Sequence, residues 1–170
     1  MKIHYSKVVI FDLIIQLDYD HVIQITKLSD ISLSLRSFNQ NNLINSNLAL
    51  FLISNQVPDF RFKADQNPLS KNFDITSFIH LKQQTCLSFL YFLVACVYPN
   101  VSKFQGFHFK TFDTQGNLSI QFNSLLCFPQ LKENYIQFTH LNHLNLHFKM
   151  NKNCSIENWM WLRGFRFPII

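Results

Sequence analysis

Three histidines in the last third of the chain, at positions 140, 143 and 147, are candidates for metal binding. On a helix, His143 and His147 would lie four residues apart on one face and could share an ion. Residues 144–150 instead alternate between apolar and polar types, which predicts a strand. In a strand the two imidazoles lie about 13 Å apart, at about 3.3 Å per residue. One ion cannot bridge that distance, so we predict that His140, His143 and His147 are exposed on a sheet face and that no metal is bound.

The four cysteines are candidate nucleophiles, but their surroundings argue against that role. They show no paired CxxC spacing, and Cys86 and Cys96 lie in or beside the most apolar stretch of the chain. Burial there raises the pKa of a thiol and leaves it inert. We expect these two, with Cys127 and Cys154, to be buried or free thiols. A thiol enzyme is the alternative, and rapid alkylation at neutral pH would reveal it.

Other arrangements typical of enzymes are missing from the sequence. The three glycines, Gly106, Gly116 and Gly164, are widely separated, so there is no glycine-rich phosphate loop. The ten acidic residues are scattered, and no two of them stand out as a general acid and base. We therefore predict that the protein is not an enzyme and uses no cofactor.

Basic residues recur beside aromatic ones, which is typical of a surface that binds nucleic acid. Alternation over residues 60–63 places Arg61 and Lys63 on one face of a short strand, away from Phe60 and Phe62. Cations of this kind neutralise phosphates, while amides and hydroxyls bind the sugar-phosphate backbone. A solvated surface is the alternative, because the net charge is only +5. The candidate RNA-binding residues are Arg36, Gln56, Arg61, Lys63, Lys82, Lys103, Lys110 and Asn117, and Lys149 has the same character.

The elements that position these residues are expected to be helices and strands of one domain. A chain of 170 residues with 48 % hydrophobic residues can bury a sizeable core. Its periodicities predict helices over residues 4–19, 82–97 and 156–162, strands over 31–35, 60–63, 73–81 and 144–150, and a hairpin turn at 114–117. We predict an α+β fold, a single compact domain over 1–170, with helices packed on one face of an antiparallel or mixed sheet.

A further helix is expected after the Asn-rich residues 39–42. Ile44, Leu48, Phe51 and Leu52 fall on one of its faces, as in a helix that packs on a core. Asn41 or Asn42 is the expected cap of this helix, and Ser155 is the expected cap of the helix near the C-terminus.

Composition bears on where the protein is made. The chain has 19 Phe and only 3 Gly, and its 11 Lys outnumber its 4 Arg. This usage suggests a gene in an AT-rich genome, such as that of an organelle, and we see no removable targeting segment. The apolar run 87–98 is shorter than the about 20 residues that a membrane span needs. A small membrane-associated protein anchored by this run is the alternative function, which carbonate extraction would distinguish.

Residues 103–131, KFQGFHFKTFDTQGNLSIQFNSLLCFPQL, resemble the signature of the family of ribosomal protein five of the large subunit. The bacterial form of that signature reads F-R-G, then S-F-D-G-x-G-N-Y-S, then I-F-P-E-I. The ending Phe165-Arg-Phe-Pro168 resembles the closing F-D-F-P of the family, Pro99 falls on the proline that ends its central helix, and Leu17-Asp-Tyr-Asp20 resembles the end of its first helix. The matches within the signature are Phe104, Gly106, Phe112, Asp113, Gly116, Asn117, Ser119, Phe128 and Pro129.

The resemblance implies a structural, non-catalytic RNA-binding protein of the large ribosomal subunit. It implies a place in the central protuberance, where 5S rRNA and neighbouring large-subunit rRNA would be bound. It also implies contact with P-site tRNA, with a small-subunit head protein across the intersubunit bridge, and with neighbouring central-protuberance proteins. With the AT-rich usage, it predicts a mitochondrial, organelle-encoded version; a plastid or an AT-rich bacterium is the alternative source.

Two segments depart from the family pattern. Where the family reads L-N-x-G-x-G, this chain has Leu33-Ser-Leu-Arg-Ser-Phe38, so Arg36 offers a charge contact in place of the glycines. The loop for which the resemblance implies contact with tRNA, about 64–72, is shorter here and lacks the glycines of the family. The tRNA-proximal residues by this resemblance are Asp65, Gln66, Asn67 and Lys71.

Overall fold

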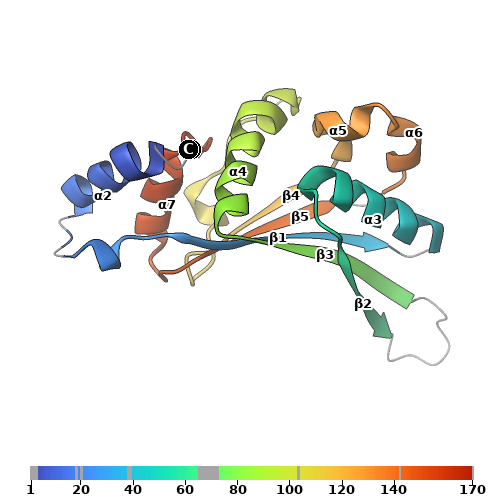
Figure 1. Cartoon of the computed structure of the whole chain (residues 1–170), viewed down its shortest axis with the longest axis horizontal. Helices are drawn as coiled ribbons and strands as arrows, with labels where there is room; N and C mark the ends of the chain where they lie inside the picture. Colours follow the sequence, from blue (N-terminus) through green and yellow to red (C-terminus); the bar gives the residue numbers. More distant parts are fainter. Residues whose placement is uncertain are drawn as a thin grey trace. The chain divides into compact units, whose positions relative to one another are not determined.

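The computed structural model describes residues 4–17, 19, 21–37, 40–64, 73–102, 104–141 and 143–169. The fold is α+β, as predicted, with helices packed on a five-stranded antiparallel sheet (Figure 1). The strands occur in the order β2-β3-β1-β5-β4, so β2 and β4 are the edges. Their bounds are β1 (Leu28–Ser37), β2 (Asp59–Ala64), β3 (Phe73–Lys82), β4 (Leu118–Phe122) and β5 (Leu144–Met150).

The chain packs as two compact units. Unit 1 comprises Met1–Ile31, Lys82–Ser119 and His147–Ile170, and unit 2 comprises Ser32–Leu81 and Ile120–Leu146. The α-helices of unit 1 are α2 (Ile10–Leu17), α4 (Gln84–Phe92) and α7 (Ser155–Gly164). Those of unit 2 are α3 (Gln40–Ser54), α5 (Pro129–Lys132) and α6 (Tyr135–Phe138). The prediction of one domain over the whole chain stays a prediction.

Strict alternation in the sequence became alternation of burial in the strands. In β5, Leu144, Leu146 and Phe148 are buried, while Asn145 and Lys149 are exposed. β1 and β4 follow the same rule, because successive side chains of a strand point to opposite faces. The predicted pairing of residues 60–63 with 73–81 is confirmed, since β2 and β3 form an antiparallel pair.

Helix α3 packs on a different face from the one that its apolar stripe predicted. Ile44 is 67 % exposed, and Leu48 and Phe51 are also exposed. The buried side chains of α3 are Ser46, Ala49, Leu50 and Ile53. The reason lies in the small Ser46: its hydroxyl is 2.9 Å from that of Ser37 on β1 and 3.1 Å from that of Ser77 on β3. Close approach of the helix to two strands thus outweighs the wider apolar stripe.

The predicted apolar helix over 82–97 is present. It consists of α4, a π-helical turn over Leu93–Val97 and a 3-10 turn over Tyr98–Asn100, and the chain becomes extended at Val101. Cys86 is buried there as expected, but Cys96 is exposed, which corrects that prediction. Leu93 and Val97 occupy the inward positions of the turn, and Cys96 lies on its outer side. Within the described ranges, no helix combines the length and the apolar character needed to cross a membrane.

Both predicted helix caps were wrong. α3 starts at Gln40, so Asn41 and Asn42 already belong to the helix. α7 starts at Ser155, and the extended residue before it, Cys154, is the N-cap. An N-cap needs non-helical backbone dihedrals, which these residues do not have.

The C-terminal segment closes unit 1. The amide of Phe107 donates a hydrogen bond of 2.9 Å to the carbonyl of Pro168, and the Phe107 and Phe167 rings stack at 5.6 Å. The Tyr98 ring stacks on Phe104 at 5.0 Å and meets Phe167 edge-on at 5.3 Å. The two ends of the predicted family signature, near residues 104–107 and 165–168, therefore form one aromatic core.

Candidate nucleic-acid interface

The β2–β3 hairpin of unit 2 positions the best-placed predicted cation. Arg61 pairs in register with Thr76, so its side chain lies on the face opposite the buried Ile75 and Ser77. Its guanidinium carbon lies 4.5 Å from the centroid of the Phe78 ring. A guanidinium held flat on a ring keeps its outward N–H groups available for phosphate oxygens.

Phe78 and His80 continue this face along β3. Their rings meet edge-on at 5.4 Å, and His80 is exposed. These two residues were not among the predicted site residues, although the alternation of buried Ile75, Ser77 and Ile79 would have placed them opposite the core. A cation, an aromatic ring and an imidazole in a row can contact phosphates and bases together.

Arg36 belongs to the same surface of unit 2. It is exposed on β1 between the buried Leu35 and Ser37. Since burial alternates along β1, its side chain projects from the face that the core does not occupy. Lys63 follows Arg61 on β2 and pairs in register with Asp74.

The remaining predicted residues lie elsewhere. Gln56 is half-buried in the turn between α3 and β2, where its amide donates to the Ser54 hydroxyl at 3.1 Å. Lys82 is exposed at the end of β3, in unit 1, and Lys110 lies in the 3-10 turn over Phe109–Thr111. The others fall outside the described residues: Lys103, Asp65, Gln66, Asn67 and Lys71.

Asn117 is used inside the protein. The predicted turn at 114–117 is confirmed, because the amide of Gly116 donates to the carbonyl of Asp113 and that of Asp113 to the carbonyl of Asn117, both at 2.8 Å. The Asn117 side-chain carbonyl accepts a hydrogen bond of 3.2 Å from the amide of Met150. Its side chain is nearly buried, so the geometry gives Asn117 a structural role in joining the turn to β5. Direct contact of Asn117 with RNA stays a prediction.

The histidines of the last third are separated as the strand prediction requires. His147 lies on β5, and its Nδ1 is 2.8 Å from the hydroxyl of Ser119 on β4, whereas His143 precedes the strand. Among the described residues, no group of three or more His, Cys, Asp or Glu side chains could hold a metal ion.

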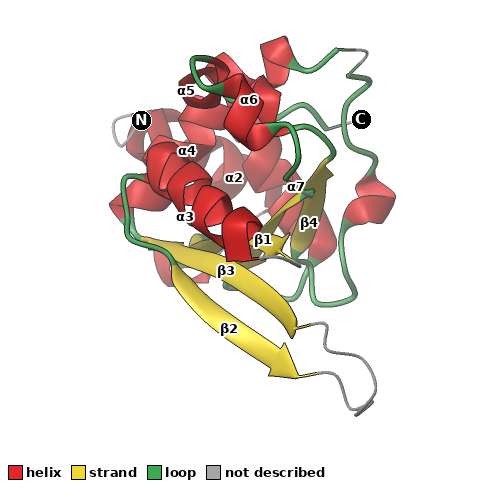
Figure 2. Cartoon of the chain, turned by 90° about the vertical axis from the view of Figure 1, so that its right-hand side faces the viewer, coloured by secondary structure: helices red, strands yellow, loops and turns green. Residues whose placement is uncertain are grey.

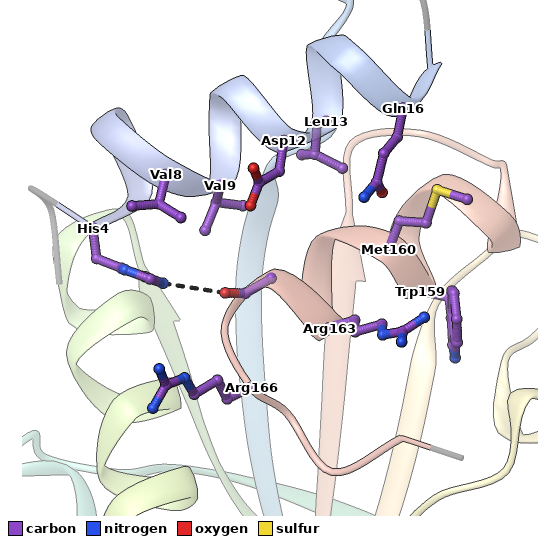
Figure 3. A pocket seen from close by; sticks show the side chains of 11 residues that line it. His4, Val8, Val9, Asp12, Leu13, Gln16, Trp159, Met160, Arg163 and Arg166 are labelled. Atoms are coloured by element: carbon purple, nitrogen blue, oxygen red, sulfur yellow. Dashed lines mark hydrogen bonds between the residues drawn. The ribbon is translucent and has the colours of Figure 1, made fainter.

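Unit 1 also contains a cavity of about 440 Å³ between α2 and α7 (Figure 3). The Nε2 atom of His4 lies 3.1 Å from the carbonyl oxygen of Gly164 at one end of it. Asp12 enters from α2, while Arg163, stacked 5.1 Å above the Trp159 ring, enters from α7. The lining thus mixes acid and base, and of the predicted site residues that the structure describes, none lines it.

Comparison with known proteins agrees with the resemblance seen in the sequence. Residues 74–169 match the model of the C-terminus of the ribosomal protein uL5 family. Among similar proteins are the Large ribosomal subunit protein uL5 of Blochmanniella floridana, 24 % identical over 99 % of this chain and 92 % of the relative, and that of Nitrosomonas eutropha, 27 % identical over 97 % and 95 %. The Large ribosomal subunit protein uL5m of Reclinomonas americana is 23 % identical over 99 % and 97 %. Because the family model covers more than half of the chain, the chain belongs to the uL5 family of ribosomal proteins.

Proposed function

We propose that this protein is a structural component of the large ribosomal subunit and binds rRNA through the open sheet face of unit 2. The family is non-enzymatic, in agreement with the prediction from sequence. The observation that carries the proposal is the exposed row formed by Arg61, Phe78 and His80, in a chain whose relatives match it over nearly its whole length. The cation supplies phosphate affinity, and the rings supply contacts that phosphate alone cannot make.

The finer assignment extends the family resemblance. The protein is proposed to lie in the central protuberance, next to 5S rRNA or neighbouring large-subunit rRNA, P-site tRNA and a small-subunit head protein. Proteins of the central protuberance are its proposed neighbours. The similarity to uL5m of Reclinomonas americana and the AT-rich residue usage support a mitochondrial ribosome as its location.

Sedimentation tests this function. The protein should move with the large subunit on a sucrose gradient at low salt and leave it as salt increases, and crosslinking should join it to rRNA. Changing Arg36, Arg61 and Lys63 together to Ala should reduce incorporation and lower the magnitude of the salt slope for RNA binding by about 2 to 3, since each phosphate contact contributes about 0.7 to 0.9.

A control variant separates the interface from total charge. Changing Lys7, Lys27 and Lys132 to Ala removes the same charge from exposed positions outside the hairpin and β1. This control should incorporate and bind with nearly the original salt slope. Equal losses in both triple variants would mean that net charge, and not the proposed face, governs binding.

A further inference from the structure

The opposite face of the same hairpin carries an uncovered aromatic pair. Phe60 and Phe62 pair in register with Ser77 and Ile75, so they lie on the core side of the sheet. Nevertheless Phe60 is 52 % exposed and Phe62 is 63 % exposed. The β2–β3 hairpin extends beyond α3, which leaves this part of its surface open (Figure 2).

The geometry of the pair offers two separate ring surfaces. The two centroids are 5.3 Å apart and the rings are inclined at 82°, so a planar ligand cannot stack on both at once. Each ring can instead take one planar group on its own face. The neighbouring side chains on this face of the hairpin, Ile75 and Ser77, are uncharged.

The edge position brings charge and ring faces close together. β2 is the outermost strand, so one side of its backbone has no strand partner. Arg61 lies between Phe60 and Phe62 in sequence and points to the other face of the strand. A polynucleotide that follows this edge can place phosphates on the Arg61 side and turn its bases over the edge onto the phenylalanine rings.

We propose that Phe60 and Phe62 are stacking platforms for unpaired RNA bases. The proposal rests on the function proposed above and specifies the kind of RNA that the hairpin binds. Aromatic side chains on a sheet surface bind bases only when these are unstacked and accessible, as in loops and single strands. A duplex hides its base faces and could contact only the cationic side.

Direct binding measurements on the purified full-length chain test this proposal. The probes are a fluorescein-labelled single-stranded oligouridylate and a duplex RNA of equal length. Changing Phe60 and Phe62 together to Leu keeps apolar bulk but removes the rings, and should weaken binding of the single strand about tenfold or more. Binding of the duplex and the salt slope should be unchanged, whereas the Phe60→Tyr, Phe62→Tyr variant should retain the affinity for the single strand.

Matched controls make each outcome decisive. Changing the exposed Phe11 and Phe109 to Leu removes two rings outside the hairpin and should leave both affinities unchanged. If the Leu variant of the hairpin binds the single strand as tightly as the original chain, the stacking proposal is wrong. It is also wrong if that variant loses incorporation into the subunit but keeps its RNA affinity, because the pair then contacts a protein. Failure of the unmodified chain to bind either RNA would instead defeat the proposed function itself.

Discussion

The side-chain amide of Asn158 on α7 donates a hydrogen bond of 2.8 Å to the backbone carbonyl of Gly116, which lies 42 residues earlier in the chain. The same amide donates to the carbonyl of Lys152 at 2.9 Å, and Asn158 is completely buried. Gly116 itself has a φ of +72°, a conformation that side chains with a Cβ rarely adopt. The family turn is therefore fixed from inside the protein by a residue of the C-terminal helix.

Changing Gly116 to Ala should destabilise the protein severely. A Cβ at this position would clash with Nδ2 of Asn158, in addition to the unfavourable φ. We expect a loss of about 2 to 4 kcal/mol in the free energy of unfolding, measured by urea denaturation. The exposed neighbour Gln115 provides the control, and its change to Ala should cost less than about 0.5 kcal/mol. Equal stability of the two variants would contradict this account of the turn.

Helix α3 offers a test of which face is buried. Changing Ser46 to Leu should cost about 2 to 4 kcal/mol of unfolding free energy, because it overpacks the contact and leaves the hydroxyls of Ser37 and Ser77 without their partner. Changing the exposed Ile44 to Ala should cost less than about 1 kcal/mol. Thermal and urea unfolding of both variants decide the matter, and the reverse ranking would restore the face predicted from sequence.

Stability at acid pH should depend on Glu157. Its partial burial raises the pKa of the carboxyl, but hydrogen bonds from Lys152 at 2.6 Å and Tyr19 at 2.5 Å outweigh this and hold the pKa below its ordinary value of 4.5. The unfolded chain therefore binds the proton more tightly than the folded one, so the contribution of Glu157 is present above pH 4.5 and is lost as the pH falls through the lower folded pKa.

Urea denaturation at a series of pH values measures that contribution. The Glu157→Gln variant should lose stability near neutral pH and show a flatter decline below pH 4.5 than the original chain. Glu133→Gln removes an exposed carboxyl and should leave the decline in place. If Glu157→Gln declined as steeply as the original chain, the carboxyl would not be the group responsible.

The cysteines should separate by reactivity. Burial raises the pKa of Cys127 to about 11 and also raises the pKa of Cys86, while Cys96 is exposed. N-ethylmaleimide at neutral pH should therefore modify Cys96 first and reach Cys86 and Cys127 only after unfolding. Mass spectrometry of peptides locates the label, and Cys96→Ser should remove the fast phase. Fast labelling of Cys127 in the folded protein would contradict its burial and revive the thiol-enzyme alternative.

Several features of the fold and the candidate interface followed from the sequence by itself. The alternation in 144–150 predicted β5, and the same rule placed Arg61 on the opposite face from Phe60 and Phe62, because the side-chain period of a strand is a local property. The turn at 114–117 was predictable for a similar reason, since a glycine in a short polar segment supplies the positive φ that the turn needs.

Only the tertiary structure decided how these elements meet. The buried face of α3 was set by the hydroxyls of Ser37 and Ser77, which belong to strands distant in sequence. The position of Phe78 beneath Arg61 depends on the β2–β3 register, and the anchor of Gly116 comes from α7. Periodicity shows which residues share a face, but close packing against partners far along the chain determines which face is covered and which is left for RNA.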